Sequence, residues 1–469
     1  MTKTKIVATI GPASESEDTI TQLIKAGVDV VRFNTKHADV NWHEKNIAKV
    51  KRIRAQLNKP VGILLDLQGP EIRIETPNQE VLNVSKDEEI YFSADFISNK
   101  KTIKIPNQQV IEVLNIGNEI LLNDGYSSFK VVAKEKDYII AKATDNYEIG
   151  NRKGMNLPGV ILNMPSISDH DWQYLDLAQR VLPEFVALSF VRGKEDIEIL
   201  KIELEKRKVK AHIVAKIEGH HAVDNIDAII DVSDVIMVAR GDLGVELPIE
   251  QITFWQKKII KKCRLASKPV ITATEMLQSM IENSRPTRAE VSDVANAVFD
   301  RSDAIMLFGE TAQGKYPVQV VQMMEKIAKF NEDQLPFTNL EIDSFINQSK
   351  IITHAVVDMI RQQKEFQIDA IVVFTETGRT ALDLARFHPN LPVIAITEDE
   401  FVRNVLAIAY GVTAYKMNLP DGEILEINSV IDLLKNEAIV KSNQRIVFIH
   451  GDKWKIPGLT NTISVKEII

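Results

Sequence analysis

Eight short apolar runs, rich in β-branched residues, recur along the first two thirds of the chain. They cover residues 5–11, 29–35, 61–69, 184–191, 212–219, 235–244, 269–277 and 303–312. Stretches with the periodicity of an amphipathic helix, such as 17–27 and 293–302, separate most of them. Eight strand-and-helix units in succession predict an α/β fold of the (β/α)8 TIM barrel type, in which the active site lies at the carboxyl ends of the strands.

One interval between these runs is too long to be a barrel loop. Residues 70–167 hold short alternating strand patterns, broken by Gly, Asn and Asp at the spacing of hairpins. We therefore expect an inserted all-β domain, a small β-barrel. Such a domain is either inert or a lid that closes over the site and excludes water. The adjacent cations Arg152 and Lys153, where the chain returns to the barrel, favour a lid.

After residue 335 the alternation of strand and helix patterns starts again. The segments 367–389, 391–399, 411–417 and 444–452 predict a separate, open α/β domain with a largely parallel sheet. For a chain of 469 residues we expect a barrel of 1–69 and 168–335, an inserted domain of 70–167 and a C-terminal domain of 336–469.

Polar residues gather at the carboxyl ends of the apolar runs. They are Arg32, Asn34, Asp66, Lys216, Glu218, Asp242, Thr274 and Glu310. Capping or core filling explains one or two of them, but so many at one end of one barrel indicate a chemical site. Lys216 and Glu218 point to the same face, because strand side chains repeat every two residues. They could form a structural ion pair, yet Glu218 and Asp242 on neighbouring strand ends also suit Mg²⁺, which takes one or two carboxylates and leaves its other positions to water and phosphate.

Composition narrows the classes of function. Lys and Arg number 57 against 65 Asp and Glu, a formal charge of −8, so the chain has no basic excess to attract nucleic acid or an anionic membrane. No apolar run approaches the ~20 residues that span a bilayer, and the chain starts without a signal-peptide pattern, so we expect a cytoplasmic protein. The single cysteine, Cys263, lies in a helical pattern and is interpreted as a packing thiol.

At the level of motifs the chain resembles the pyruvate kinase family over essentially its full length. The matching segments, in the family's order, are KIVATIGPAS, VVRFNTKH, LLDLQGPEIR, NRKGMNLPG, ALSFVR, AKIEG, IMVARGDLGVELP, TATEMLQSM, RPTRAEVSDVANAVFD and GETAQGKYP. The resemblance implies transfer of a phosphoryl group from phosphoenolpyruvate to ADP, giving ATP and pyruvate, in the last step of glycolysis. It also implies Mg²⁺ or Mn²⁺ as cofactor and a homotetramer.

The resemblance also implies a role for each site residue. Glu218 and Asp242 match the Mg²⁺ ligands, and the residues that match catalytic positions are Lys216, Arg32 and Thr274. The substrate-binding positions correspond to Arg32, Lys216, Gly241, Asp242 and Thr274, and the nucleotide-binding positions to Arg73, Lys153, Asn34 and His37. Arg73 and Lys153 lie at the two junctions of the inserted domain, so closure of a lid would bring both cations in.

A first departure concerns the family's monovalent-cation site. Its positions here are Asn34, Lys36, Asp66 and the carbonyl of Leu67, with Lys36 in place of a serine. A lysine cannot ligate K⁺, and two positive charges would compete for Asp66. We hypothesise that the Lys36 ammonium takes the place of K⁺, which makes K⁺ doubtful as a cofactor. The alternative is that Lys36 turns to solvent and the site is degraded.

Two further departures concern protonation and regulation. Phe308 replaces a serine of the polar chain that delivers a proton to the enolate, so the proton would pass through Thr274 and water, more slowly. Glu376 stands in the turn that receives a sugar phosphate in regulated relatives, and a carboxylate repels phosphate. Activation by fructose bisphosphate is therefore not expected, although the remaining effector-turn residues suit another anion: Thr375, Thr377, Gly378, Arg379 and Thr380. Many such turns, however, use Thr and Gly only for capping.

Two other functions stay open at this point. A non-catalytic paralogue could sense nucleotides or sugar phosphates, but the intact charged set argues against drift, because metal carboxylates without a function cost stability. A metal-dependent carbon–carbon lyase could use the same barrel. That function would not explain the inserted domain or the cations on the nucleotide side.

Overall fold

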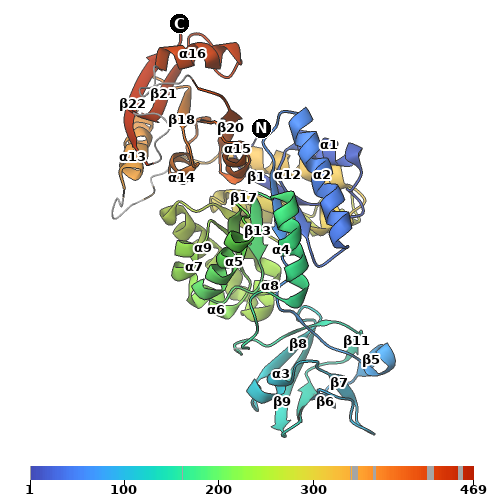
Figure 1. Cartoon of the computed structure of the whole chain (residues 1–469). Coiled ribbons are helices and arrows are strands. Elements are labelled where there is room, and N and C mark those ends of the chain that lie inside the picture. The colour runs from blue at the N-terminus through green and yellow to red at the C-terminus, as the bar shows by residue number, and fades with distance from the viewer. Residues whose placement is uncertain are drawn as a thin grey trace.

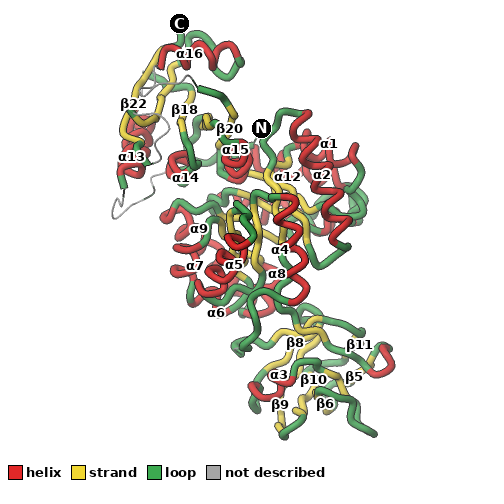
Figure 2. Tube along the Cα trace, viewed as in Figure 1, coloured by secondary structure: helices red, strands yellow, loops and turns green. Residues whose placement is uncertain are grey.

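The structure is a computed structural model that describes residues 2–160, 162–337, 340, 347–362, 366–419, 427–452 and 458–469. The inserted domain lies at one end of the barrel and the C-terminal domain at the other (Figure 1). Figure 2 shows helices around the barrel strands, whereas the inserted domain consists mainly of strands and loops.

Eight parallel strands close into the barrel. They are β1 (Lys5–Thr9), β2 (Val28–Asn34), β3 (Gly62–Asp66), β13 (Phe185–Leu188), β14 (His212–Ile217), β15 (Val235–Ala239), β16 (Val270–Ala273) and β17 (Ala304–Leu307). Their order is β1-β17-β16-β15-β14-β13-β3-β2, and each predicted run overlaps one of them. The prediction of a (β/α)8 barrel is confirmed. The register places Asn34 beside Asp66 at the carboxyl ends of β2 and β3.

Helices surround this barrel. In chain order they are α1 (Glu17–Ala26), α2 (Val40–Gln56), α4 (Asp169–Val181), α5 (Lys194–Lys206), α6 (His220–Asp224), α7 (Ile226–Val232), α8 (Arg240–Glu246), α9 (Ile252–Ala266), α10 (Arg288–Phe299), α11 (Gly309–Ala312) and α12 (Pro317–Glu332), with the 3₁₀ turns η2 (Ile249–Gln251) and η3 (Gln278–Ile281). Helix α1 shows why they form. It buries Ile20, Leu23 and Ile24, spaced along one face, and Ser16 caps its amino end.

The inserted domain is a small, closed β structure. Its elements are β4 (Ile72–Arg73), η1 (Pro77–Gln79), β5 (Leu82–Val84), β6 (Glu89–Ser93), β7 (Thr102–Lys104), α3 (Gln108–Val113), β8 (Glu119–Leu122), β9 (Ser127–Lys134), β10 (Tyr138–Ala143), β11 (Tyr147–Ile149) and β12 (Gly154–Asn156). Seven strands follow the order β4-β12-β8-β9-β10-β6-β7. Glu75, just beyond β4, forms an antiparallel bridge with Lys104 of β7, which joins the two edges of the sheet. The all-β character of the inserted domain is as expected, and a single bridge is what brings its seven-stranded sheet toward a barrel.

The C-terminal domain is the predicted open α/β fold. Its elements are α13 (Gln348–Gln362), β18 (Ala370–Phe374), α14 (Arg379–Ala385), β19 (Val393–Thr397), α15 (Glu400–Val405), η4 (Leu406–Ile408), β20 (Val412–Lys416), α16 (Ile427–Asn436), β21 (Arg445–Gly451) and β22 (Thr460–Glu467). The sheet order is β20-β19-β18-β21-β22, and only the β21–β22 pair is antiparallel. The exact residue limits of the three domains stay predictions.

The C-terminal domain closes the amino end of the barrel. Val405 and Ile408 belong to the same buried apolar cluster as the barrel residues Val30 and Leu64. The ammonium of Lys5, at the start of β1, donates to the carbonyl of Val412 at 2.8 Å. Only the carboxyl end of the barrel therefore faces the inserted domain and a ligand.

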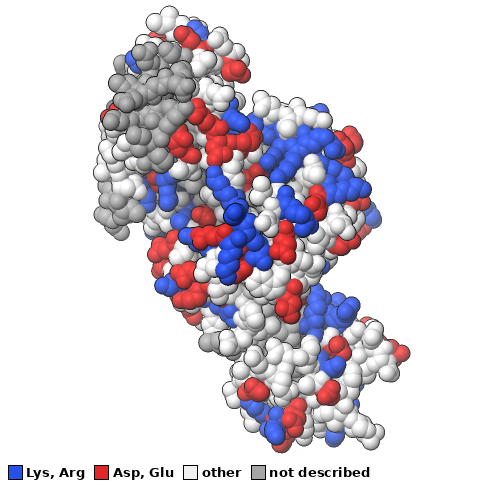
Figure 3. All heavy atoms as spheres, in the orientation of Figure 1, with Lys and Arg blue, Asp and Glu red and all other residues white. Residues whose placement is uncertain are grey.

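The surface carries both signs of charge. On the face seen in Figure 3, Lys and Arg gather over the barrel with Asp and Glu between them, and the inserted domain shows smaller groups of both charges separated by uncharged surface. Within the described ranges, no helix has the length and apolar character that a membrane crossing requires.

Gly11, after β1, marks a close approach at the carboxyl end of the barrel. A Cβ on Gly11 would lie 2.6 Å from the carbonyl oxygen of Ala312. We expect Gly11→Ala to lower the free energy of unfolding by about 1–3 kcal/mol, measured by urea denaturation. Gly244→Ala is the control, because its Cβ would meet only a side-chain carbon of Ile252 at 3.9 Å. Equal stability of both variants would contradict the close packing.

Candidate active site

The carboxyl ends of the barrel strands open into a cavity of about 600 Å³ that reaches the inserted domain. The predicted site residues that line it are Arg32, Asn34, Lys36, His37, Leu67, Arg73, Lys153, Lys216, Glu218, Gly241, Asp242 and Thr274. Asp66 lies behind this wall and is 1% exposed. The structure thus brings the predicted substrate, metal and nucleotide residues together in one place.

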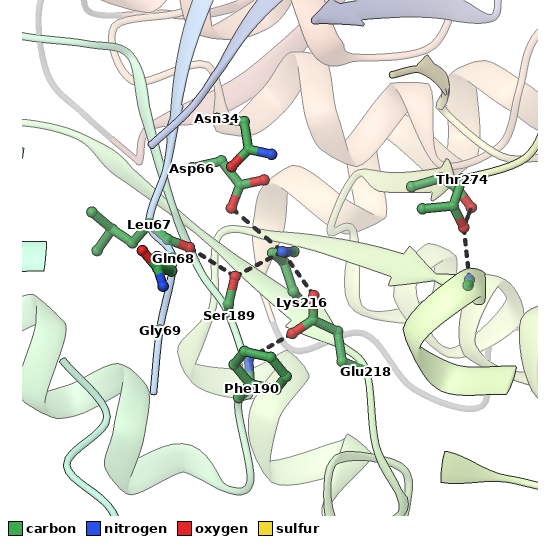
Figure 4. A network of polar contacts seen from close by, with 12 residues as sticks. Asn34, Asp66, Leu67, Gln68, Gly69, Ser189, Phe190, Lys216, Glu218 and Thr274 are labelled. Carbon is green, nitrogen blue, oxygen red and sulfur yellow. Dashed lines mark hydrogen bonds and ion pairs between the residues drawn. The ribbon is translucent and has the colours of Figure 1, made fainter. Parts of the chain in front are cut away.

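Lys216, near the end of β14, lies at the centre of a buried polar network (Figure 4). Its ammonium lies 2.7 Å from Glu218 Oε1 and 3.5 Å from Asp66 Oδ1. It also donates to Ser189 Oγ at 2.7 Å, and that hydroxyl donates to the carbonyl of Leu67 at 2.8 Å. Three strand ends therefore hold one ammonium group in a fixed position.

The charges in this network determine which groups are ionised. Burial opposes the charge of Lys216, but Asp66, Glu218 and Asp242 outweigh it and raise the pKa of the lysine. Burial also opposes the charge of Asp66, but Lys216 and Arg32 keep the pKa of this carboxyl below its ordinary value. Burial raises the pKa of Glu218, and repulsion from Asp242 adds to that rise while Lys216 offsets only part of it. Lys216 and Asp66 are therefore charged at neutral pH, and Glu218 is the carboxyl that a further cation would stabilise.

Glu218 and Asp242 have the chemistry of a divalent metal site. The N–H of Phe190 donates to Glu218 Oε2 at 2.6 Å and fixes this carboxylate. A cation bound between the two carboxylates would reverse the repulsion that raises the pKa of Glu218. Among the described residues there is no cluster of three or more His, Cys, Asp or Glu side chains that could hold a metal. Carboxylate oxygens are hard ligands, so Glu218 and Asp242 suit a hard divalent cation such as Mg²⁺ whose other ligands are water and phosphate oxygens.

Arg32, on β2, is held from two sides. Its Nε and Nη2 each lie 2.7 Å from Asp66 Oδ2, and its Nη1 donates to Thr9 Oγ1 at 3.0 Å. The side chain is buried, yet it lines the cavity. A guanidinium fixed in this way presents its remaining N–H groups to an anion.

Thr274, after β16, shapes the turn at the start of α8. Its hydroxyl accepts from the N–H of Gly241 and donates to the carbonyl of Ala273, both at 2.7 Å. Thr274 adopts φ 69°, which is strained for a β-branched residue and typical of functional sites. Arg240 stabilises the turn, because it donates to the carbonyl of Thr274 at 2.8 Å. These hydrogen bonds hold the backbone of the turn in place at the cavity wall.

Arg73 and Lys153, the two cations predicted to bind the nucleotide, lie where the inserted domain meets the barrel. Arg73 is opposite Gly154 in the β4–β12 pair, so it lies next to Lys153. Arg73 donates to Glu71 Oε2 at 3.0 Å and to the carbonyl of Arg152 at 2.8 Å. Desolvation, together with nearby cations, lowers the pKa of His37. This part of the cavity is suited to phosphates.

The ammonium of Lys36 does not contact Asp66. The prediction that it lies beside Asp66, in the monovalent-cation site, is therefore wrong. The ammonium lies 3.4 Å from Glu71 Oε2, whereas Asp66 pairs with Arg32 and Lys216. The physical reason is that Asp66 is already occupied by two buried cations, while Glu71, at the entrance to the inserted domain, shares its Oε2 between Arg73 and Lys36. The side-chain Oδ1 of Asn34 accepts from the backbone N–H of Lys36 at 3.2 Å.

The polar groups of the predicted effector turn are largely engaged within the fold. Gly378 adopts φ 83° and donates its N–H to Thr375 Oγ1 at 2.9 Å. The hydroxyl of Thr380 pairs with that of Thr460 at 2.9 Å, and the N–H of Arg379 donates to Thr377 Oγ1 at 3.5 Å. These contacts have the character of capping, and an effector site here stays a prediction.

Several residues of the site were missed in the sequence. Ser189 and Thr9 both lie near the carboxyl ends of predicted strands. The search for polar residues at strand ends, which identified the other site residues, could have identified these two as well. Phe190 acts through its backbone, and Glu71 becomes a partner only through the direction in which the inserted domain leaves the barrel. No sequence pattern signals either contact.

Lys216→Met should destabilise the protein by about 3–5 kcal/mol, because it leaves buried carboxylates without a partner. The stabilisation should be present above the ordinary pKa of Asp66, 3.8, and below that of Lys216, 10.5. It should be lost as the pH falls through the lowered pKa of Asp66, or rises through the raised pKa of Lys216. Urea unfolding at several pH values measures this, with the exposed Lys201→Met as control. An unchanged stability at neutral pH would contradict the charge balance.

Known proteins match this chain over its length. A family model described as "Pyruvate kinase, barrel domain" matches residues 1–321, and one described as "Pyruvate kinase, alpha/beta domain" matches residues 351–466. A pyruvate kinase of Bacillus licheniformis is 40% identical over 461 residues, with 96% of this chain and 77% of the relative covered. A pyruvate kinase of Clostridium acetobutylicum is 38% identical over 472 residues, with 100% of both covered. The solved structure of a pyruvate kinase from Cryptosporidium parvum has a TM-score of 0.92 at 32% identity and covers 100% of this chain, with 96% of that chain matched. With these matches added to the barrel, the inserted domain and the charged cavity, the chain belongs to the pyruvate kinase family.

Proposed function

We propose that this chain transfers the phosphoryl group of phosphoenolpyruvate to ADP, giving pyruvate and ATP. The observation that carries the proposal is the buried pair of cations, Lys216 and Arg32, beside the carboxylates Glu218 and Asp242 in one cavity. Phosphoryl transfer needs positioned charge more than covalent chemistry, and this cavity offers positioned charge. The matched relatives are themselves named pyruvate kinases.

Lys216 and Arg32 are proposed to bind the transferring phosphoryl group. Both are held in place by carboxylates before substrate arrives, so little reorganisation is needed when charge develops. The carboxylate of the substrate would lie at the turn of Gly241 and Asp242, which Thr274 supports. The phosphoryl group and the carboxylate would thus be anchored at separate points.

Glu218 and Asp242 would hold the divalent cation, Mg²⁺ or Mn²⁺. When bound, it would neutralise charge on the substrate's carboxylate and enolate oxygens. The hydrogen bond from Phe190 keeps Glu218 directed into the cavity.

Arg73 and Lys153 are proposed to bind the phosphates of ADP, with Asn34 and His37 beside them. Closure of the inserted domain as a lid would carry both cations toward the strand ends and exclude water from the enolate. The exposed position of Arg73, 48% of its side chain, leaves it free to move with the lid.

Protonation of the enolate is proposed to be slower here than phosphoryl transfer. The hydroxyl proton of Thr274 is donated to Ala273, and Phe308 has no proton to offer. Glu310 is buried with a raised pKa, but it accepts from the backbone of Phe308 and of Leu277. The hydroxyl of Thr274 would have to rotate, with water as the source of the next proton.

Lys36 is proposed to replace K⁺ through Glu71 rather than Asp66. The ion pair places a fixed positive charge at the junction of barrel and lid, next to Arg73. A bound monovalent cation would add charge to the same region, so the lysine makes it dispensable.

Assembly and location are proposed from the same family membership. Ile249 and Phe254 are large apolar side chains on neighbouring elements, 82% and 59% exposed. Such exposed groups suit a contact with another copy of the chain, and we propose a cytoplasmic homotetramer. No nucleic acid or membrane is proposed as a partner.

The reaction is tested by pyruvate formation from phosphoenolpyruvate and ADP with Mg²⁺. We expect turnover by the wild-type chain and a loss of about 10²-fold or more in Glu218→Gln, because one metal carboxylate is removed. The exposed Glu250→Gln is the matched control and should retain full activity. Binding of ADP without any turnover would reject the kinase and favour the sensor.

K⁺ dependence is tested in a buffer with tetramethylammonium as the only monovalent cation. The wild-type chain should turn over, and added K⁺ should change its rate less than about 2-fold, because Lys36 supplies the charge. Lys36→Ser should become dependent on K⁺, whereas the exposed Lys45→Ser should behave as wild type. If Lys36→Ser keeps the wild-type salt profile, Lys36 only joins the lid to the barrel.

A further inference from the structure

Phe308, at the end of β17, packs its ring against the guanidinium of Arg32. The central carbon of the guanidinium lies 4.8 Å from the ring centroid. The N–H of Phe308 donates to Glu310 Oε2 at 2.8 Å, and Glu310 is itself buried. The ring is therefore held by a backbone that has little freedom to shift.

The other contacts of Arg32 lie in the plane of its guanidinium. Two of its nitrogens are bound to Asp66 and one to Thr9. A guanidinium has five N–H groups in one plane, so these contacts leave one on Nη1 and one on Nη2 for a ligand. The in-plane contacts with Asp66 and Thr9, together with the Phe308 ring on one face, hold the guanidinium of Arg32 in one orientation. A guanidinium held in that orientation can present its remaining N–H groups to the oxygens of a phosphoryl group.

The ring of Phe308 also changes the surroundings of the charge on Arg32. Phe308, Met306 and Met237 line the same cavity as Arg32 and form an apolar part of its wall. A cation on an aromatic face is attracted by the ring and loses water on that side, which strengthens its remaining hydrogen bonds. A serine at this position could neither cover the guanidinium nor exclude water from it.

We propose that Phe308 is a positioning residue for the phosphoryl group of the substrate, and that it acts by covering and orienting Arg32. This inference rests on the proposed function, because it takes the partner of Arg32 to be the phosphoryl group. The inference assigns Phe308 a role in substrate binding. This role is separate from the absence of the proton-delivering serine hydroxyl at this position. An aromatic ring at this point favours phosphoenolpyruvate over the product, which has no phosphoryl group.

The test compares Phe308→Leu, Phe308→Tyr and Phe308→Ser by calorimetric titration with phosphoenolpyruvate and Mg²⁺, without ADP. We expect the Kd to rise roughly 3- to 30-fold in the Leu and Ser variants, as the loss of a partly desolvated cation–π contact predicts. Phe308→Tyr keeps the ring and should stay within about 2-fold. The Kd of pyruvate should be the same in all four proteins, and KM should change more than kcat.

An Arg32→Met background shows whether the ring acts through arginine. There, Phe308→Leu should have little further effect on the Kd of phosphoenolpyruvate. Thermal unfolding checks that each variant is folded, and Phe308→Tyr serves as the conservative rescue.

Three outcomes overturn the inference. They are an unchanged Kd of phosphoenolpyruvate in Phe308→Leu, an equal loss of affinity for pyruvate, and an unchanged Kd of phosphoenolpyruvate in Phe308→Ser alongside a higher kcat, which would leave the residue only its effect on the proton step. Failure of the proposed function is seen separately, as wild-type binding of phosphoenolpyruvate with no turnover.

Discussion

A lysine ammonium buried at the carboxyl end of a barrel has to be matched by carboxylates, and this requirement organises the site. Lys216 is 9% exposed, and its charge is balanced by Asp66 and Glu218. Removing either side of such a buried set costs far more than a surface ion pair contributes. Asp66 is therefore committed to the two buried cations and is not available to a third. Lys36 turns to Glu71 for that reason.

The closed amino end of the barrel has a similar consequence for function. Because the C-terminal domain packs Val405 and Ile408 against the barrel interior, the charged groups can meet a ligand only at the opposite end. The inserted domain leaves and re-enters the barrel at that end, through β4 and β12. Its junction carries Arg73 and Lys153, so any movement of the inserted domain would carry these two charges with it.

The sequence predicts most of this arrangement where a simple periodicity governs it. Parallel strands in register bring their ends to one level, which is why Asn34 and Asp66 could be placed together. Contacts that depend on the path of a loop could not be predicted. The carboxylate of Glu71 reaches Lys36 only because of the direction of the chain after β3, and the positive φ of Thr274 is imposed by packing and not by its residue type. Backbone donors such as Phe190 leave no trace in residue identity.

The departures at Lys36 and Phe308 both line the cavity at the carboxyl ends of the strands. Lys36 adds a charge held by Glu71, and Phe308 covers a charge that is already present, that of Arg32. Under the proposed function both changes would affect how a phosphoryl group is held, and neither replaces the carboxylates Glu218 and Asp242. A chain that had lost its chemistry would have no reason to keep these two carboxylates while its cation environment changed, because carboxylates withdrawn from water are costly to retain. The proposed metal ligands are thus kept while the charges around them change.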